Sequence, residues 1–261
     1  MLRFRSFLPV AALLVGAVIL GAPTQARASF AITVFVDTVN QGVVLSAGSN
    51  ANDFSVDPVN VTNFHISSIS SLTNWTGAPD GAVMSNTTNL SIRTTFALPG
   101  THTITIVISE NGWLAPTGSP LALSSTAGGT IGHVGGGSNT VFATNQGFLD
   151  NSNTLATTLT PGGAFTPLAT ATAVASGTST SNLNYTPSPG INAATPGGTP
   201  FNMTQVFSFK FTVTGGSQST ANVSGTVVAS VPAPAGLTLA LAGAPFLGVG
   251  TWLRRRRCRA V

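Results

Sequence analysis

Residues 207–228 read FSFKFTVTGGSQSTANVSGTVV, and this stretch decides the predicted fold. Phe207, Phe209 and Phe211 alternate with polar residues, which is the period of a strand that buries one face. The dipeptide Gly215-Gly216 is a turn signal, and a second alternating run follows it. The sequence therefore predicts a β-hairpin here.

The same pattern recurs in the N-terminal half of the chain. Residues 90–98 and 104–108 both alternate between apolar and polar or small side chains, and the turn dipeptide Pro99-Gly100 lies between them, so a second hairpin is expected. Further strands are predicted within 32–36 and 59–69, and no stretch has a helical apolar stripe. These patterns predict an all-β body, an antiparallel β-sandwich or jelly-roll-like fold.

The middle of the body is richer in glycine than the predicted strands are. Gly128-Gly129, Gly135-Gly136-Gly137 and Gly162-Gly163 interrupt residues 111–200, so short strands and long loops are expected there. His133 is accordingly expected in a glycine-rich turn. No linker-like composition divides residues 29–230, which are interpreted as one domain.

The positive net charge belongs to the two ends of the chain. Of ten basic residues only Arg93 and Lys210 lie within 29–230, which also holds all six acids. The body therefore has no basic patch for a nucleic acid, and nucleic-acid binding is excluded as a function. Cys258 is the single cysteine, so the body has no disulfide framework.

Residues 1–28 have the features of a secretory signal peptide with an apolar signal helix. A positively charged start and the apolar run 8–20 precede Ala26 and Ala28, the small residues that a signal peptidase accepts. Cleavage is expected before Ser29. A retained N-terminal anchor is disfavoured because the apolar run is short for a bilayer.

The C-terminal end has the layout of a membrane span. Residues 235–253 carry no charge and would extend about 28 Å as a helix, close to the thickness of a bilayer core. Basic residues at 254–259 follow, and by the positive-inside rule they stay in the cytoplasm, so the body faces outward. This cluster includes Arg254, Arg255, Arg256 and Arg257.

A short proline motif precedes the predicted transmembrane helix. Residues 231–236 read Val231-Pro232-Ala233-Pro234-Ala235-Gly236. The order of motif, apolar helix and arginine cluster over 231–261 resembles the PEP-CTERM sorting signal of bacterial surface proteins, with Ala233 in place of the glutamate of that family's Pro-Glu-Pro consensus. The resemblance implies an exosortase-type transpeptidase, cleavage near Pro232 to Pro234, and transfer to a surface component. A plain, unprocessed membrane anchor is the alternative.

The body shows no catalytic or cofactor motif, and we expect no enzyme activity and no cofactor. Oxygen ligands for calcium at 50–53 and Asp57 follow no defined spacing, and turn chemistry is the simpler interpretation. Trp75 and Trp113 lie within two residues of an asparagine and are the candidate glycan contacts, with Tyr185 as a weaker third. Core aromatics are the competing interpretation.

Together these features predict an exported cell-envelope or extracellular-matrix protein, structural or associated with exopolysaccharide. The first alternative is a surface carbohydrate-binding or adhesive β-sandwich module, and the second is an exported hydrolase. The expected partners are signal peptidase, an exosortase-type transpeptidase, the inner membrane and exopolysaccharide. The protein is expected to be membrane-anchored before processing and then to lie at the cell surface or in the matrix.

Overall fold

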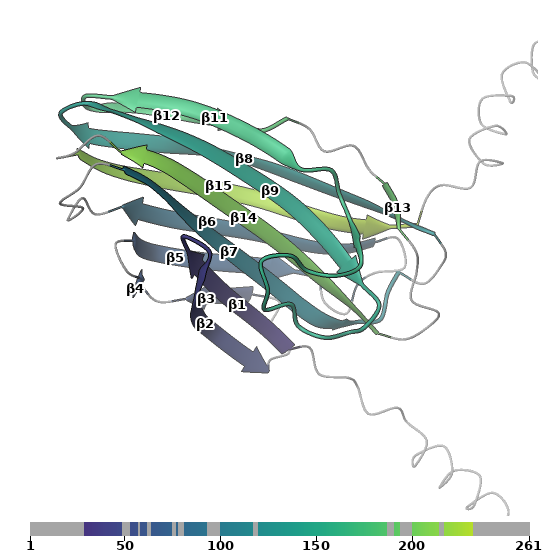
Figure 1. Cartoon of the computed structure of the whole chain (residues 1–261). Coiled ribbons are helices and arrows are strands. Elements are labelled where there is room, and N and C mark those ends of the chain that lie inside the picture. The colour runs from purple at the N-terminus through teal and green to yellow at the C-terminus, as the bar shows by residue number, and fades with distance from the viewer. Residues whose placement is uncertain are drawn as a thin grey trace, which may run out of the picture.

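In the computed structural model of this chain, the described residues form two antiparallel sheets packed as a sandwich (Figure 1). The structure describes residues 29–48, 53–56, 58–61, 64–74, 77, 81–92, 100–116, 120–186, 191–193, 200–213 and 217–231. Sheet A consists of β1 (Ser29–Val36), β2 (Val39–Gly48), β7 (Gly100–Trp113), β9 (Ser138–Asp150), β10 (Ala164–Phe165), β11 (Ala169–Ser176) and β14 (Phe201–Val213). Sheet B consists of β3 (Asp53–Val56), β4 (Val59–Val61), β5 (Phe64–Thr73), β6 (Gly81–Ile92), β8 (Leu121–Gly135), β12 (Ser179–Asn184), β13 (Ile191–Ala193) and β15 (Ser217–Ser230). The predicted all-β sandwich is confirmed.

The predicted signal and transmembrane helices lie outside the described residues. Within the described part of the chain, no helix is long and apolar enough to cross a membrane.

The order of strands places the longest strands at the centre of each sheet. Sheet A runs β10-β9-β14-β7-β1-β2, and β11 also pairs with β9. Sheet B runs β12-β8-β15-β6-β5-β3, with β13 on β8 and β4 on β5. The strand predicted at 32–36 is part of β1, whereas the stretch predicted at 59–69 is divided between β4 and β5.

Both predicted hairpins are wrong in their pairing. β14 pairs with β7 and β9 in sheet A, whereas β15 pairs with β6 and β8 in sheet B. β6 and β7 are likewise in different sheets, so each of these connections crosses from one layer to the other. The alternation specifies which side of each strand is buried. Two such strands can lie side by side or face each other across the core, and both arrangements bury the same residues.

The expectation of short strands in the middle of the body holds for β10 and β13, which have two and three residues, but is wrong for β8 and β9. β8 has 15 residues and β9 has 13, and they are among the longest strands of the fold. The glycines of β8 lie inside the sheet rather than in a loop. A Cβ at Gly129 would lie 2.9 Å from Cγ2 of Val223 on β15, so a glycine is what allows these strands to approach.

The phenylalanines of β14 form the centre of the core. Phe207, Phe209 and Phe211 are fully buried, and the ring centroids of Phe64 and Phe211 lie 6.1 Å apart across the two sheets. Each large apolar side chain buried in this way contributes about 1.5–3 kcal/mol. The alternating apolar side chains identified in the sequence therefore form the interface between the layers.

A buried polar chain also connects the two sheets. The Asn86 side chain of β6 donates from Nδ2 to Oε1 of Gln205 on β14 at 2.7 Å. Gln205 in turn donates from Nε2 to Oδ1 of Asn145 on β9 at 2.9 Å. All three side chains are buried, and Gly225 of β15 leaves space for Gln205 because a Cβ there would collide with its amide.

Candidate functional site

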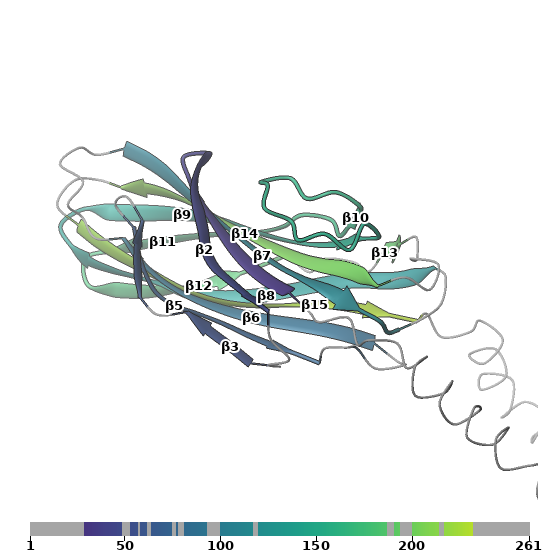
Figure 2. The ribbon, with the colours of Figure 1, turned by 90° about the horizontal axis from the view of Figure 1, so that it is seen from below.

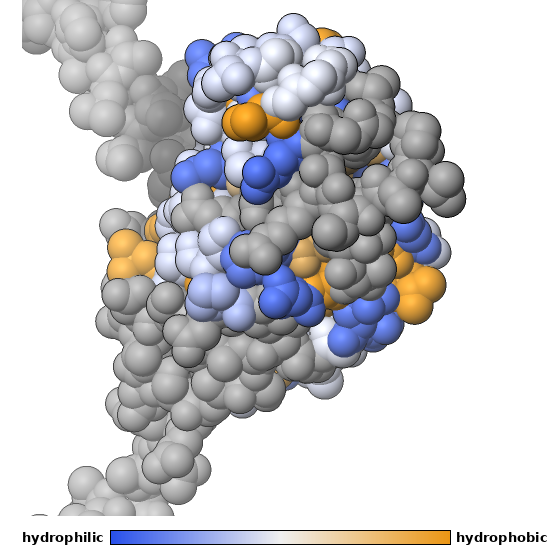
Figure 3. All heavy atoms as spheres, turned by 90° about the vertical axis from the view of Figure 1, so that its left-hand side faces the viewer, coloured by the Kyte–Doolittle hydropathy of each residue, from blue (hydrophilic) through white to orange (hydrophobic). Residues whose placement is uncertain are grey.

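A groove crosses sheet B near the end at which β8 turns into β9. It has a volume of about 360 Å³, within the size range of small-ligand pockets. The end of the sandwich with the β8–β9 and β11–β12 turns faces the viewer in Figure 3, where hydrophilic residues surround isolated hydrophobic ones. The groove is lined by Gly132, His133 and Val134 of β8, by Thr178, Ser179 and Thr180, and by Gln218 and Thr220 of β15.

The groove continues into a hydroxyl- and amide-rich surface over β12, β8 and β15. Their register aligns Asn182, Thr130 and Asn222 in one row across the three strands. All three side chains are exposed, whereas the residues that alternate with them face the core. We call the exposed residues of these three strands the neutral face. Sequence reasoning missed it because 127–135 was interpreted as a loop, although alternating Thr and Asn residues are its signal.

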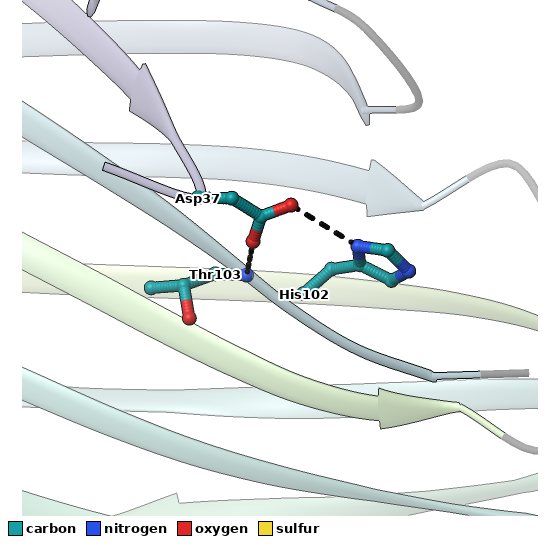
Figure 4. Close-up of polar contacts among 3 residues, drawn as sticks. All are labelled: Asp37, His102 and Thr103. Carbon is teal, nitrogen blue, oxygen red and sulfur yellow. Dashed lines mark hydrogen bonds and ion pairs between the residues drawn. The ribbon is translucent and has the colours of Figure 1, made fainter. Parts of the chain in front are cut away.

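An aspartate–histidine pair fastens the β1–β2 turn to β7 (Figure 4). Asp37 accepts the backbone N–H of Thr103 on Oδ1 at 2.8 Å, and its Oδ2 lies 3.2 Å from Nδ1 of His102. Asp37 and Thr38 have positive φ angles of 48° and 70°, as a two-residue type I′ turn requires. The aspartate therefore closes this turn by two contacts with β7, which is a structural role.

Glu110 lies inside the sandwich and not at a surface. Its exposed fraction is 3%, and Oε1 accepts a long hydrogen bond of 3.4 Å from Oγ1 of Thr73 on the opposite sheet. Its Oε2 atom has no hydrogen-bond partner in the described structure. Desolvation by burial raises the pKa of Glu110 from 4.5 to about 8, against the opposing effect of the Thr73 bond. This carboxyl is therefore mostly protonated at neutral pH.

The loop between β9 and β10 covers part of the outer side of sheet A (Figure 2). Asn153 accepts the backbone N–H of Gly112 on Oδ1 at 2.7 Å, and its carbonyl accepts from Nδ2 of Asn111 at 3.1 Å. A cavity of about 220 Å³ lies beneath the loop, between Asp150 and Asn202. Both Asp150 carboxylate oxygens accept hydrogen bonds from Ser152, so the loop is held by its own contacts.

The outer side of sheet A also exposes several apolar side chains. Phe142 is 40% and Phe165 is 54% exposed, and the Phe165 ring lies 5.9 Å from that of buried Phe148. Leu168 and Val174, at and beside β11, are more than half exposed. We call Phe142, Phe165, Leu168 and Val174 the apolar strip. The apolar strip differs in this way from the neutral face of sheet B, whose exposed side chains are mostly hydroxyl and amide groups.

The three histidines lie within strands. His65 of β5 is within 2.8 Å of Oδ1 of Asn60, and His102 pairs with Asp37. His133 differs from the prediction, because it is 1% exposed within β8 and its Nδ1 lies 3.3 Å from Oγ of Ser219. It belongs to the interior beside the groove, not to a flexible turn.

The structure places Trp113 in the core. Its exposed fraction is 0%, and its ring stacks on Phe201 with centroids 6.4 Å apart. An indole in this position offers no ring face to a sugar. Trp75 lies outside the described residues, and Tyr185 is partly buried against the core.

The predicted processing residues lie beside the fold. Val231 is 41% exposed and directly follows β15. The other predicted processing residues lie outside the described part, namely Ala26, Ala28, Pro232, Ala233, Pro234, Arg254, Arg255, Arg256 and Arg257. The calcium alternative at 50–53 and 57 also rests mainly on residues outside it. Among the described residues, no group of three or more His, Cys, Asp or Glu side chains is placed to hold a metal ion.

Comparisons with known proteins identify no family. No protein-family description and no curated protein matches the sequence. Similar solved structures include a xylan-binding domain of a family 22 carbohydrate-binding module, with 13% identity, a TM-score of 0.23, and coverage of 70% of this chain and 89% of that one. A carbohydrate-binding module solved with β-1,4-galactotriose matches at 6% identity and a TM-score of 0.18, over 63% of this chain and 88% of that one. TM-scores this low do not indicate a ligand or a function for this chain.

Proposed function

We propose that this chain is an exported cell-envelope or extracellular-matrix protein whose working part is the sandwich of residues 29–230. Signal peptidase removes residues 1–28, and an exosortase-type transpeptidase cleaves near Pro232 to Pro234 after the predicted 235–253 helix has entered the inner membrane. The mature protein acts by attachment and association with exopolysaccharide, and it catalyses no reaction.

One observation carries this proposal: every described strand lies between the two predicted processing points. β1 starts at Ser29, and its residues from Phe30 onward are buried. β15 ends at Ser230, and the next residue is exposed. Removal of both ends would therefore leave every described strand pairing in place.

The contact at the first strand is compatible with a new N-terminus. The backbone nitrogen of Ser29 donates to Oδ1 of Asn111 at 2.7 Å. After cleavage this nitrogen becomes an α-ammonium, which donates to an amide oxygen at least as well as a peptide N–H does. Cleavage before Ser29 thus keeps the contact that holds the start of β1 to β7.

The described acids favour a non-catalytic role over the hydrolase alternative. Glu110 is buried in the core, Asp37 of the β1–β2 turn accepts a hydrogen bond from Thr103, and Asp150 accepts one from Ser152 of its own loop. No two of these three carboxyl groups share a hydrogen-bond partner in the described structure. A pair of carboxylates that meet across a cleft, as glycoside hydrolysis requires, is not formed by them.

The test is the mass of the protein recovered from the cell surface. We expect a species that begins at Ser29 and lacks the arginine cluster 254–259. Replacing Ala28 by Leu should block the first cleavage, whereas Ala28→Gly should permit it, because the peptidase accepts only small side chains there. Recovery of surface protein that retains Arg254 to Arg257 would refute sorting by cleavage and leave a simple anchor.

The second candidate function, a carbohydrate-binding or adhesive surface module, is favoured by the groove on sheet B. Its hydroxyl and amide side chains are of the type that hydrogen-bonds sugars, and its volume suits a small ligand. The two candidates are compatible, because a matrix protein needs a surface that contacts the matrix.

A further inference from the structure

The neutral face has hydrogen-bonding capacity that the fold does not use. In the described structure, no side-chain hydrogen bond is recorded for Asn182, Thr130 or Asn222, which form its central row. Hydroxyl and amide side chains each donate and accept hydrogen bonds. By contrast, the polar chain of Asn86, Gln205 and Asn145 inside the sandwich is connected from residue to residue. The face therefore presents donors and acceptors to whatever lies outside it.

The neutral face also lacks charge. Its described side chains are Thr, Ser, Asn and Gln together with Val134 and glycine, and they include no acid, lysine or arginine. Among the described charged residues, Asp37, Glu110, Asp150 and Lys210 belong to sheet A or its connections, and Asp53 lies on β3, at the edge of sheet B opposite β12. A charged ligand would lose hydration on this face and meet no counter-charge, so an uncharged ligand is the complementary one.

Glycines shape the face. Gly132 lines the groove, and a Cβ there would lie 2.7 Å from Oγ1 of Thr220. Gly128 is on the same side of β8, four residues earlier, between Asn184 and Ser224 on the neighbouring strands, and a Cβ there would have no atom within 4 Å. The groove at Gly132 and the open space above Gly128 therefore lie on either side of the exposed Thr130, and the two glycines are about 13 Å apart along the strand.

The composition of the face argues against a protein partner. Protein interfaces have an apolar core with aromatic residues, whereas the one large hydrophobic residue described on this face is Val134. The hydroxyl groups of a sugar chain are themselves donors and acceptors, which matches the side chains present. A repeating chain also suits a row of equivalent groups better than a single small molecule does.

We propose that the neutral face of β12, β8 and β15 binds an uncharged polysaccharide, with one chain lying across the row of Asn182, Thr130 and Asn222 and entering the groove at Gly132. This inference rests on the proposed function, because it supplies the contact between the exported sandwich and its matrix. Hydrogen bonds that replace bonds to water contribute little individually, so the affinity of one site is modest and does not depend on salt.

The experiment is affinity electrophoresis of the full-length chain in a neutral detergent. The gels contain dextran, galactomannan or hydroxyethyl cellulose as uncharged polymers, or alginate as an acidic one. We expect at least one uncharged polymer to retard the protein equally at low and high salt. We expect alginate to have no effect at high salt, because salt screens its attraction to the basic ends of the chain. Because the unprocessed chain is used, the result does not depend on whether the ends are removed in the cell.

Two variants locate the binding surface. Gly128→Val occupies the open space above this glycine without a clash and favours a strand, so the variant should fold and bind more weakly by about tenfold or more. Thr130→Glu places a charge in the central row and should also weaken binding about tenfold or more. Thr172→Glu is the matched control, because Thr172 is also an exposed strand threonine but lies on β11 of sheet A. Melting temperatures of all variants should stay close to that of the parent chain.

Three outcomes would overturn this inference. The first is that none of the uncharged polymers retards the protein, and the second is retardation by alginate at high salt. The third is loss of binding in Phe142→Ser with full binding in Thr130→Glu, which would move the site to the apolar strip of sheet A. If mass analysis shows correct processing while binding is absent, only this inference fails. If binding is present and the ends are retained at the cell surface, only the sorting proposal fails.

Discussion

Asn86 and Gln205 join the two sheets by a 2.7 Å hydrogen bond inside the sandwich, from Nδ2 of the first to Oε1 of the second. They are 119 residues apart in the chain, and both side chains are fully buried. An amide pair in this position stabilises the fold only while both partners are present, because an unpaired buried amide pays its full desolvation cost. The pair therefore connects β6 of sheet B to β14 of sheet A inside the core.

Replacing Gln205 by Met should destabilise the protein by about 2–4 kcal/mol. The substitution keeps the length of the side chain but leaves Nδ2 of Asn86 and Oδ1 of Asn145 without their partner. Urea denaturation measures the change. Gln218→Met is the control, because Gln218 is exposed and its replacement should alter the free energy of unfolding by less than about 0.5 kcal/mol. Equal effects of the two changes would contradict a stabilising role of the buried chain.

Stability should fall with rising pH because of Glu110. The pKa of this carboxyl is about 8 in the folded protein and close to 4.5 in the unfolded chain, so the folded state holds the proton more tightly. The contribution of Glu110 to the free energy of unfolding is fully present below pH 4.5 and is lost as the pH rises to about 8. Each unit of difference corresponds to about 1.4 kcal/mol, so the loss amounts to several kcal/mol.

Glu110→Gln is the variant that tests this dependence. An uncharged amide of the same shape should remove the Glu110 contribution to the decline, so the parent chain and the variant should diverge between pH 5 and pH 8. Denaturant unfolding at a series of pH values measures both. Parallel curves for the two proteins would mean that Glu110 titrates normally in the fold.

Trp113→Ala should destabilise the protein by about 3–5 kcal/mol, because it opens a cavity beside Phe201. Trp113→Phe keeps an aromatic ring and should cost less. Neither change should weaken polysaccharide binding by the protein that remains folded, since the indole has no exposed face. A stable Trp113→Ala protein that had lost binding would instead identify this residue as a glycan contact.

Thr38→Gly should stabilise the protein by up to about 1 kcal/mol. Thr38 is β-branched and has a φ of 70°, a conformation that glycine adopts without steric cost. Thermal unfolding measures the gain. Thr130→Gly is the opposite control: this threonine lies within strand β8, where glycine weakens the strand, so the melting temperature should fall. A fall for both variants would show that the turn is not strained at position 38.

The sequence predicted the buried side of β14 correctly and its neighbours wrongly. Phe207, Phe209 and Phe211 line the core as their alternation indicated, yet β14 pairs with β7 and β9 and not with the strand that follows it. The turn dipeptide Gly215-Gly216 is compatible with either geometry. Pairing is a long-range property, because it depends on which faces meet across the whole sandwich.

The candidate site was only partly predictable. Trp113 lies two residues from Asn111 in the sequence, but its burial depends on the residues packed around it in the fold, which include Phe201 of β14. The neutral face was missed because Gly128, Gly129 and Gly132 favoured a loop on local grounds. β12 and β15 pair with β8 on both sides and hold these glycines in an extended strand.

The amino-acid sequence by itself determined the β class, the alternation of buried and exposed residues, the absence of a basic surface on the body and the layout of the two ends. These are properties of residue order and composition, which need no knowledge of neighbours in space. Only the tertiary structure decided that β14 and β15 face each other across the core, that Glu110 is sealed between the sheets, and that Asn182, Thr130 and Asn222 form one row. The reason is that many strand orders bury the same alternating residues, and the choice among them depends on contacts between distant segments.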